Sequence, residues 1–291
     1  MLRTIGRMAE RRDTRAWRQR HRVAERDSWR QTIMPALLLF VLLGTVAGGG
    51  WLWWRGNQAL VPTDATTLCA TDRPPTEIHV VLLDMSDAFT EAQRLQVENS
   101  LGRLKSSIPK LGRIEVFRVT GAQDRVITPV FTVCNPGDGR DVNQLYQNPA
   151  FATAKWNQFS SGLNTQLAAL MATPSTPTSP IMEAIQATAL RTFGRPEFQG
   201  IPKRLTVVSD LLQNVPGGFS QYEDVGTFAS FERTAYFNRV RADLTGVKVT
   251  CLYLVRPGAP QKWPEHYVFW EQFFKAQGGE VGTIEPIYGA K

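Results

Sequence analysis

The sequence predicts an α/β fold in which a doubly wound, mostly parallel sheet follows one N-terminal transmembrane helix. Three observations support this prediction. Short apolar runs alternate with segments of helical spacing between residues 77 and 291, as in sheets with helices on both faces. Residues 33–54 hold no charged side chain. The run 78–89 (IHVVLLDMSDAF) brings a carboxylate and then a hydroxyl to the end of an apolar stretch, as a buried parallel strand does at the edge of a sheet.

Residues 1–30 form a basic tail with ten Arg and four acidic residues. This tail accounts for most of the net charge of +7, because the other 261 residues hold 23 basic and 22 acidic side chains. That balance does not support a basic groove for nucleic acid on the folded part. Positive residues favour the cytoplasmic side of a membrane. We therefore expect a cytoplasmic N-terminus and, in a bacterial inner membrane, a periplasmic C-terminal domain.

Residues 31–55 are expected to form the single transmembrane helix. The uncharged run 33–54 would extend roughly 33 Å as a helix, which is enough to cross a bilayer core. Three Trp residues lie at one end of it, where indole rings favour the interface between water and lipid. The alternative is a signal peptide cleaved after Ala47. Residues 56–76 are rich in Thr, Pro and Asp and are expected to be a linker.

The globular part, residues 77–291, is predicted to alternate strands with helices. Strands are expected at residues 78–83, 114–119, 126–133, 204–209, 247–255 and 281–287. Helices are expected at residues 91–107, 151–171, 181–193, 228–244 and 266–277. In the helix predicted over residues 151–171, for example, the apolar residues Phe159, Leu163 and Leu167 recur at helical spacing. Turn-forming residues fill 134–144.

Polar side chains follow two of the predicted strands where each strand ends. Asp84 and Ser86 follow the first strand, and Asp210 follows the fourth. Parallel strands end at one edge of a sheet, where ligands bind, and Ser179 precedes a helix that could bring its hydroxyl to the same edge. Carboxylate and hydroxyl oxygens suit Mg²⁺ or Mn²⁺, and two carboxylates this close repel each other without a cation. The sequence therefore predicts a divalent-cation site formed by these four residues.

These motifs resemble the von Willebrand factor type A domain, a Rossmann-like family. The matching segments are 84–86 (DMS), 178–185 (TSPIMEAI) and 205–210 (LTVVSD), and the resemblance extends over about residues 77–288. In that family an Asp-x-Ser-x-Ser loop, a Thr and an Asp form a metal-ion-dependent adhesion site. An acidic side chain of a partner protein completes the metal shell there.

The resemblance implies a set of metal ligands in this chain. They are Asp84, Ser86, Ser179 (in the place of the Thr) and Asp210. Asp87 and Thr178 are implied auxiliary residues, Asp87 through a water-mediated contact or added negative charge. Ala88 stands where the family has its second loop serine, so one direct ligand is missing. The implied function is protein–protein binding without enzymatic activity, through a cation that engages an acidic residue of the partner.

The three cysteines lie in two kinds of context. Cys251 is inside the apolar run VKVTCLYLV and is most simply a core residue. Cys69 and Cys134 lie in loop-like segments and could form one disulfide in an oxidising compartment, or remain two free thiols. In the resembled fold the third strand runs antiparallel to the rest. That direction places Cys134 at the same edge as Cys69 and supports the pairing.

Two other functions are kept as alternatives. The string LLDMSDAF is also similar to the start of isochorismatase-type hydrolases, in which Asp84 would work with Cys251 as the nucleophile. The second alternative is a metal-free structural subunit of a membrane complex. The three His residues are scattered, and the sequence has no Walker loop, Gly-x-Ser-x-Gly elbow or Cys-x-x-Cys pair. The preferred prediction is a single-pass membrane protein that displays a protein-binding domain.

Overall fold

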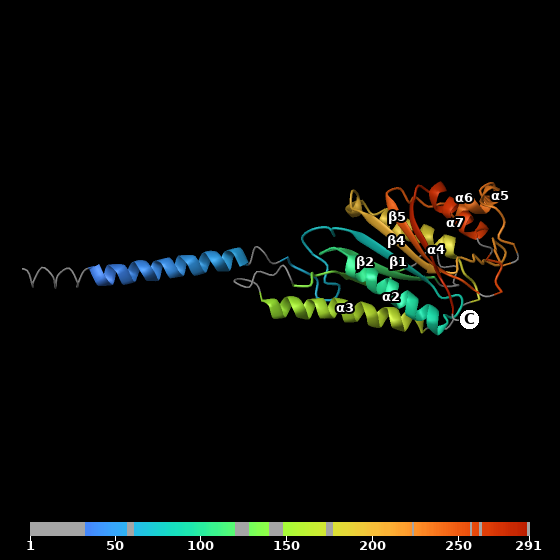
Figure 1. The fold of residues 1–291 in the computed structure, drawn as a ribbon. Coiled ribbons are helices and arrows are strands. Elements are labelled where there is room, and N and C mark those ends of the chain that lie inside the picture. Colours follow the sequence, from blue (N-terminus) through green and yellow to red (C-terminus); the bar gives the residue numbers. More distant parts are fainter. Residues whose placement is uncertain are drawn as a thin grey trace, which may run out of the picture. The chain divides into compact units, whose positions relative to one another are not determined.

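The computed structural model describes residues 33–56, 61–119, 128–139, 148–172, 177–222, 224–256, 258–261 and 264–289. The chain divides into two compact units, residues 1–60 and 61–291. The described part of the first unit is one helix, Ile33–Gly56, which is 24 residues long (Figure 1). Its length and apolar composition would allow it to span a membrane, as predicted. Residues 31 and 32 of the predicted helix lie outside the described residues.

The second unit is built around a six-stranded sheet with the order β3-β2-β1-β4-β5-β6 (Figure 1). The strands are β1 (Ile78–Asp84), β2 (Arg113–Val119), β3 (Phe131–Cys134), β4 (Lys203–Ser209), β5 (Val247–Leu254) and β6 (Glu280–Ile287). β3 is antiparallel to β2, and every other neighbouring pair is parallel. The predicted mostly parallel sheet is confirmed, including its antiparallel third strand. The predicted start of that strand, residues 126 and 127, lies outside the described residues.

β1 lies inside the sheet and is buried along its whole length. Its side chains alternate between the two faces, because successive residues of a strand point in opposite directions. Val80 and Leu82 join one apolar cluster, and Val81 and Leu83 join the other. Because both faces of β1 are covered, its residues form a mainly apolar run in the sequence. It ends with Asp84 at the carboxyl edge of the sheet.

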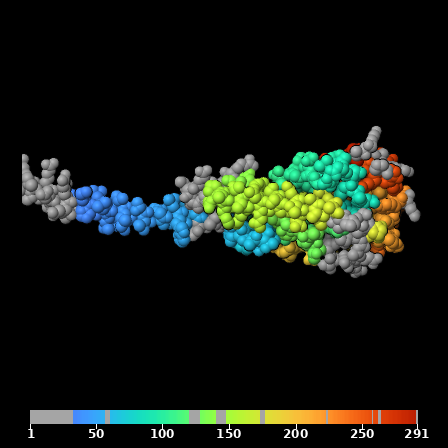
Figure 2. Space-filling view, turned by 90° about the horizontal axis from the view of Figure 1, so that it is seen from below, coloured from blue at the N-terminus to red at the C-terminus, as the bar shows by residue number. Residues whose placement is uncertain are grey.

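Helices cover both faces of the sheet, as expected of a doubly wound fold (Figure 1). α2 (Glu91–Ser107) and α3 (Pro149–Met171) lie side by side on one face (Figure 2), where Lys105 Nζ donates to Ser160 Oγ at 2.9 Å. On the other face lie α4 (Ile181–Thr188), α5 (Phe228–Phe231), α6 (Ala235–Arg239) and α7 (Glu265–Ala276). α4 continues as a π-helix over Ala189–Phe193, and a 3₁₀ turn covers Pro196–Phe198.

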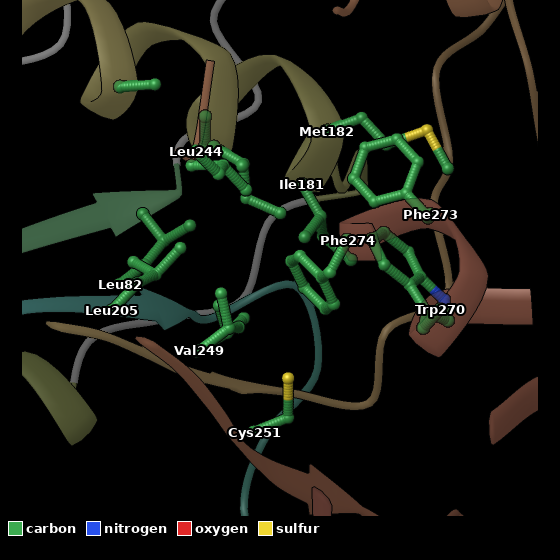
Figure 3. Close-up of a cluster of buried hydrophobic side chains, with 14 of the residues drawn as sticks. Leu82, Ile181, Met182, Leu205, Leu244, Val249, Cys251, Trp270, Phe273 and Phe274 are labelled. Atoms are coloured by element: carbon green, nitrogen blue, oxygen red, sulfur yellow. The ribbon is translucent and has the colours of Figure 1, made fainter. Parts of the chain in front are cut away.

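Aromatic side chains of α7 dominate the core on the α4 side of the sheet. Trp270, Phe273 and Phe274 are completely buried. Figure 3 shows them among apolar side chains of the sheet and of α4, including Val249 and Ile181. Rings of this kind bury about 150–250 Å² each. α7 is therefore held firmly against the sheet by apolar contacts.

The helix predicted over residues 228–244 is wrong, because this segment forms the two short helices α5 and α6. Thr234 lies between them. Its Oγ1 accepts from Phe237 N at 3.2 Å, which caps α6, and donates to the Phe231 carbonyl at 2.7 Å, which ends α5. A threonine side chain that bonds to nearby backbone groups competes with continuation of a helix. The apolar spacing was real, but a local cap divides the segment.

Residues 61–76, expected to belong to a linker, are part of the second compact unit. The predicted disulfide between Cys69 and Cys134 is present, with Cα atoms 4.7 Å apart. Cys134 ends β3 and pairs with Arg113, the first residue of β2. The cross-link therefore lies at the edge of the sheet opposite to Asp84.

Candidate binding site at the carboxyl edge of the sheet

The carboxyl edge of the sheet gathers the four site residues predicted from the sequence. Asp84 ends β1 and Asp210 follows β4, and these two strands are hydrogen-bonded neighbours. Ser179 reaches this edge through an antiparallel bridge, in which its backbone and that of Asn214 exchange two hydrogen bonds of 2.9 Å. Ser86 lies in the loop after β1. All four are buried, and Asp84 and Asp210 are only 2% and 1% exposed.

Both oxygens of the Asp84 carboxylate accept hydrogen bonds. Oδ2 accepts from Ser179 Oγ at 2.9 Å and from Ser209 Oγ at 2.7 Å. Oδ1 accepts from the backbone N–H of Ser86 at 3.0 Å. Burial raises the pKa of Asp84, and these hydrogen bonds oppose that rise because they favour the ionised form. Hydroxyl and backbone donors thus enclose this carboxylate.

Asp210 is paired with a cation of the chain itself. Its Oδ2 atom accepts from Arg256 Nε at 3.3 Å, and its Oδ1 atom accepts from Leu212 N at 3.0 Å. Burial and the neighbouring charge of Asp84 raise the pKa of Asp210 to about 7, against the opposing effects of the Leu212 hydrogen bond and of Arg256. The Arg256 side chain is 14% exposed. Removing one partner of such an enclosed pair leaves a buried charge without compensation.

The Arg256 guanidinium also contacts the loop after β1. Nη1 donates to the Ala88 carbonyl at 2.5 Å, and Nη2 donates to the Asp87 carbonyl at 3.2 Å. Gln261 fixes the backbone of Arg256. Its Oε1 accepts from Arg256 N at 2.7 Å, and its Nε2 donates to the Asp210 carbonyl at 2.7 Å. One side chain from the end of β5 therefore connects the loops after β1 and β4. We call the following set the edge cluster: Asp84, Ser179, Ser209, Asp210 and Arg256.

The loop after β4 has a strained backbone beside the edge cluster. Leu211 has a φ of 59°, a left-handed conformation that is uncommon outside glycine. Ser209 Oγ supports it by accepting from Leu211 N at 2.8 Å. Buried Gln213 ties the same loop to α4, since it accepts from Met182 N at 3.0 Å and donates to Glu183 at 2.8 Å. These contacts fix the turn that follows β4.

The two auxiliary residues implied by the resemblance lie in the loops at the same edge. Asp87 Oδ2 accepts from Tyr222 Oη at 3.1 Å. Burial, followed by the charges of Asp210 and Asp87, raises the pKa of the Tyr222 phenol. Thr178 is half-buried and directly precedes Ser179. Asp87 therefore holds an aromatic side chain of the loop after β4.

Ser209, Arg256 and Gln261 contribute to this edge, and the sequence analysis missed all three. The rule that identified Asp84 and Asp210 was a polar side chain where a parallel strand ends. The same rule applies to Ser209, the last residue of β4, and to Arg256, which follows β5 by two residues. Gln261 lies farther from any strand and carries no comparable signal in the sequence.

The donor atoms at this edge fit a divalent cation poorly. Both Asp84 oxygens already accept hydrogen bonds, and Asp210 faces a guanidinium whose positive charge would repel a metal ion. Ala88 offers only its backbone carbonyl, and Arg256 uses that oxygen. Among the described residues, no group of three or more His, Cys, Asp and Glu side chains could hold a metal ion. The Mg²⁺ or Mn²⁺ site stays a prediction, which the Arg256 contacts oppose.

Cys251, the nucleophile of the hydrolase alternative, lies in the apolar core. It is completely buried and belongs to the cluster around Phe274 and Val249 (Figure 3). Its partner in the neighbouring strand is Val207. Burial raises the pKa of the Cys251 thiol, which disfavours the thiolate that acts as a nucleophile. This is the environment of a core cysteine.

Several solved structures are remotely similar to this chain. No protein-family model and no curated protein matches the chain. A conserved hypothetical protein BatB from Bacteroides thetaiotaomicron is similar at 11% identity and a TM-score of 0.36, over 72% of this chain and 91% of that one. An aerotolerance-related membrane protein from Bacteroides fragilis NCTC 9343 is similar at 10% identity and a TM-score of 0.34, over 72% and 90%. The pilus adhesin SpaC from Lactobacillus rhamnosus GG, in an open conformation, is similar at 10% identity and a TM-score of 0.37, over 74% of this chain and 28% of the adhesin. Likenesses this remote carry no inference about function.

Proposed function

We propose that this chain is a membrane-anchored protein-binding module whose binding surface is the carboxyl edge of the sheet. The observation that carries the proposal is the hydrogen bonding within the edge cluster, in which Asp84 and Asp210 each accept hydrogen bonds from side chains of other segments. Connected polar networks of this kind make the loops around them rigid. Loops held on a rigid scaffold are where binding residues concentrate.

Exposed tyrosines at the carboxyl edge of the sheet supply contact area for a partner. Tyr222 is 40% exposed, and Tyr288, directly after β6, is 58% exposed. Tyrosine is enriched at protein interfaces and among the residues that dominate binding energy. The hydrogen bond between Tyr222 and Asp87 holds the ring in place before a partner arrives, which lowers the entropy lost on binding.

A second form of the proposal includes a divalent cation at the same edge. The convergence of Asp84, Ser86, Ser179 and Asp210 favours it, because this is the ligand set implied by the von Willebrand type A resemblance. In that form, Mg²⁺ or Mn²⁺ would connect the edge to an acidic side chain of the partner. The ion pair between Arg256 and Asp210 opposes it, so we prefer binding without a metal.

The proposed location is the periplasmic face of a bacterial inner membrane. The helix Ile33–Gly56 would serve as the anchor, with the Arg-rich residues 1–30 on the cytoplasmic side. The disulfide between Cys69 and Cys134 supports an oxidising compartment. Protease added to spheroplasts should therefore digest the domain. Protection of the domain until the membrane is broken would contradict this orientation.

The binding surface is tested by replacing Tyr222 with Ala in the full chain. We expect the yield of its partner in a crosslinking capture from membranes to fall about ten-fold or more, as for an aromatic residue central to an interface. Phe151→Ala is the matched control, because Phe151 is a 55% exposed ring on α3. The control should retain the wild-type yield.

The same capture can contradict the binding surface and can distinguish the two forms of the proposal. Retention of the partner by Tyr222→Ala, or equal losses in both variants, would contradict a binding surface at the carboxyl edge. Capture by the wild type in EDTA and again in Mg²⁺ tests the cation. A partner that is captured only in Mg²⁺ would favour the cation-bridged form.

A further inference from the structure

Arg256 connects the two loops whose acidic residues were predicted to share a metal ion. Its Nε atom donates to Asp210 after β4, and its Nη atoms donate to the carbonyls of Asp87 and Ala88 after β1. A divalent cation in the predicted site would make the same connection between these loops. The guanidinium makes it with hydrogen bonds in place of coordination bonds.

The two carboxylates at this edge also favour a nearby cation. Asp84 and Asp210 are both buried and interact electrostatically with each other. Among the ion pairs of the described residues, only that with Arg256 includes either carboxylate. The pair is enclosed, with side-chain exposures of 14% for Arg256 and 1% for Asp210, so solvent and salt screen it less than a surface ion pair.

The backbone at Arg256 is fixed in a way that an ordinary surface arginine is not. Gln261 Oε1 accepts from Arg256 N at 2.7 Å, while Gln261 Nε2 donates to the carbonyls of Asp210 and Leu254 at 2.7 and 3.0 Å. The Gln261 side chain thus connects the backbone of Arg256 to the backbone of Asp210. Ala88, which lacks the hydroxyl of a metal ligand, instead supplies a carbonyl to Nη1.

We propose that the Arg256 guanidinium is a built-in cation that replaces the divalent metal of the predicted site and orders the carboxyl-edge loops without it. This inference concerns the state of the chain before any partner binds, and it does not depend on the proposed function. It predicts that loss of the guanidinium allows the site to bind a metal ion. Without the guanidinium, the negative charge of Asp84 and Asp210 is uncompensated, and the site that they form with Ser86 and Ser179 should accept Mg²⁺ or Mn²⁺.

The experiment compares melting temperatures of the full-length protein in EDTA, Mg²⁺ and Mn²⁺. Wild type should melt at the same temperature in all three. Arg256→Ala should melt about 6–20 °C lower in EDTA, as expected for breaking an enclosed ion pair in a domain of this size. Mn²⁺ at ten times its dissociation constant should then raise the melting temperature of this variant by about 3–6 °C. Electron paramagnetic resonance should show bound Mn²⁺ in the variant and none in wild type.

Arg113→Ala is the matched control for the loss of an enclosed ion pair. Arg113 pairs with Glu115 at 2.6 Å, with side-chain exposures of 20% and 3%, at the amino-terminal edge of the sheet. This control should also melt at a lower temperature, but Mn²⁺ should not restore it. Arg256→Lys keeps the charge and should recover part of the stability without gaining a response to Mn²⁺.

Three results would overturn the inference. The first is binding of Mn²⁺ by wild type with a rise in its melting temperature. The second is a loss of stability in Arg256→Ala that Mn²⁺ does not reverse. If Arg256→Ala fails to fold, Arg256→Met takes its place. It is compared with a double variant that combines Arg256→Met with Asp210→Asn and so removes both charges. A double variant no more stable than Arg256→Met would be the third contrary result.

Discussion

The hydroxyl of Ser209 has two roles at the carboxyl edge. It donates to Asp84 Oδ2 at 2.7 Å and accepts from Leu211 N at 2.8 Å. The hydroxyl of Ser179 donates to the same Asp84 oxygen at 2.9 Å. Leu211, whose backbone is left-handed, depends on Ser209 in particular, because its N–H donates to the Ser209 side chain.

We predict that Ser209→Ala lowers the free energy of unfolding more than Ser179→Ala does. The first change removes a donor to a buried carboxylate and leaves the buried Leu211 N–H without its acceptor, which should cost about 1–3 kcal/mol. The second removes a donor to Asp84 alone. Urea denaturation with unchanged m-values would measure both losses. A loss in Ser179→Ala that equals or exceeds the loss in Ser209→Ala would show that the Leu211 contact is unimportant.

At the scale of elements, a buried histidine connects α7 to β5. His266 is completely buried, and Trp270 Nε1 donates to its Nε2 atom at 3.2 Å. An indole N–H can only donate, so Nε2 carries no proton and Nδ1 bears it. Nδ1 lies 2.7 Å from the Tyr253 hydroxyl of β5. Burial lowers the pKa of His266 to about 4.

This lowered pKa predicts a loss of stability in acid. An unfolded His has a pKa near 6.5, so the unfolded state binds a proton before the folded state does. The contribution of neutral His266 is complete above about pH 6.5 and is lost as the pH falls toward 4. Between pH 7 and 4, wild type should lose roughly 2–3 kcal/mol more free energy of unfolding than His266→Gln.

Urea denaturation at a series of pH values measures this difference. The raised pKa of Asp210 acts in the opposite direction, because the folded state then holds the extra proton. Asp210 is present in both proteins, so its contribution cancels in the comparison. Parallel pH dependences for wild type and His266→Gln would contradict the prediction.

The strands were more predictable from the sequence than the helices, for a physical reason. β1, β4 and β5 are covered on both faces, so each contains a short, mainly apolar run that is easily recognised. The segment 228–244 has helical apolar spacing, yet Thr234 bonds to the backbone on both sides of itself and divides it. Spacing reports which residues are buried, whereas a cap depends on one side chain and its local geometry.

At the scale of the whole molecule, the disulfide and the candidate site lie at opposite edges of the sheet. The bond joins cysteines 65 residues apart, and in the chain-entropy model a loop of that length contributes roughly 4 kcal/mol. We predict that replacing Cys69 and Cys134 together with Ser lowers stability by about this amount. Partner capture below the melting temperature should be unchanged, because the edge cluster lies at the other edge.

Thermal melts and the crosslinking capture test both parts of this prediction. Loss of capture in a variant that is still folded would show that the two edges are coupled. Mass mapping under non-reducing conditions supplies a second check on the wild-type protein. Two free thiols in protein from an oxidising compartment would contradict the bond itself.

The sequence by itself determined the α/β fold and the delivery of Asp84 and Asp210 to one edge of the sheet. Strand direction is enough for that inference, because parallel neighbouring strands end on the same side. Only the tertiary structure decided which positively charged group lies against those carboxylates. Arg256 contacts Asp210 and Ala88 across 46 and 168 residues of sequence, and such a contact depends on loop paths and side-chain reach. The acidic pair that suggested a metal ion is therefore compensated by an arginine of the same chain.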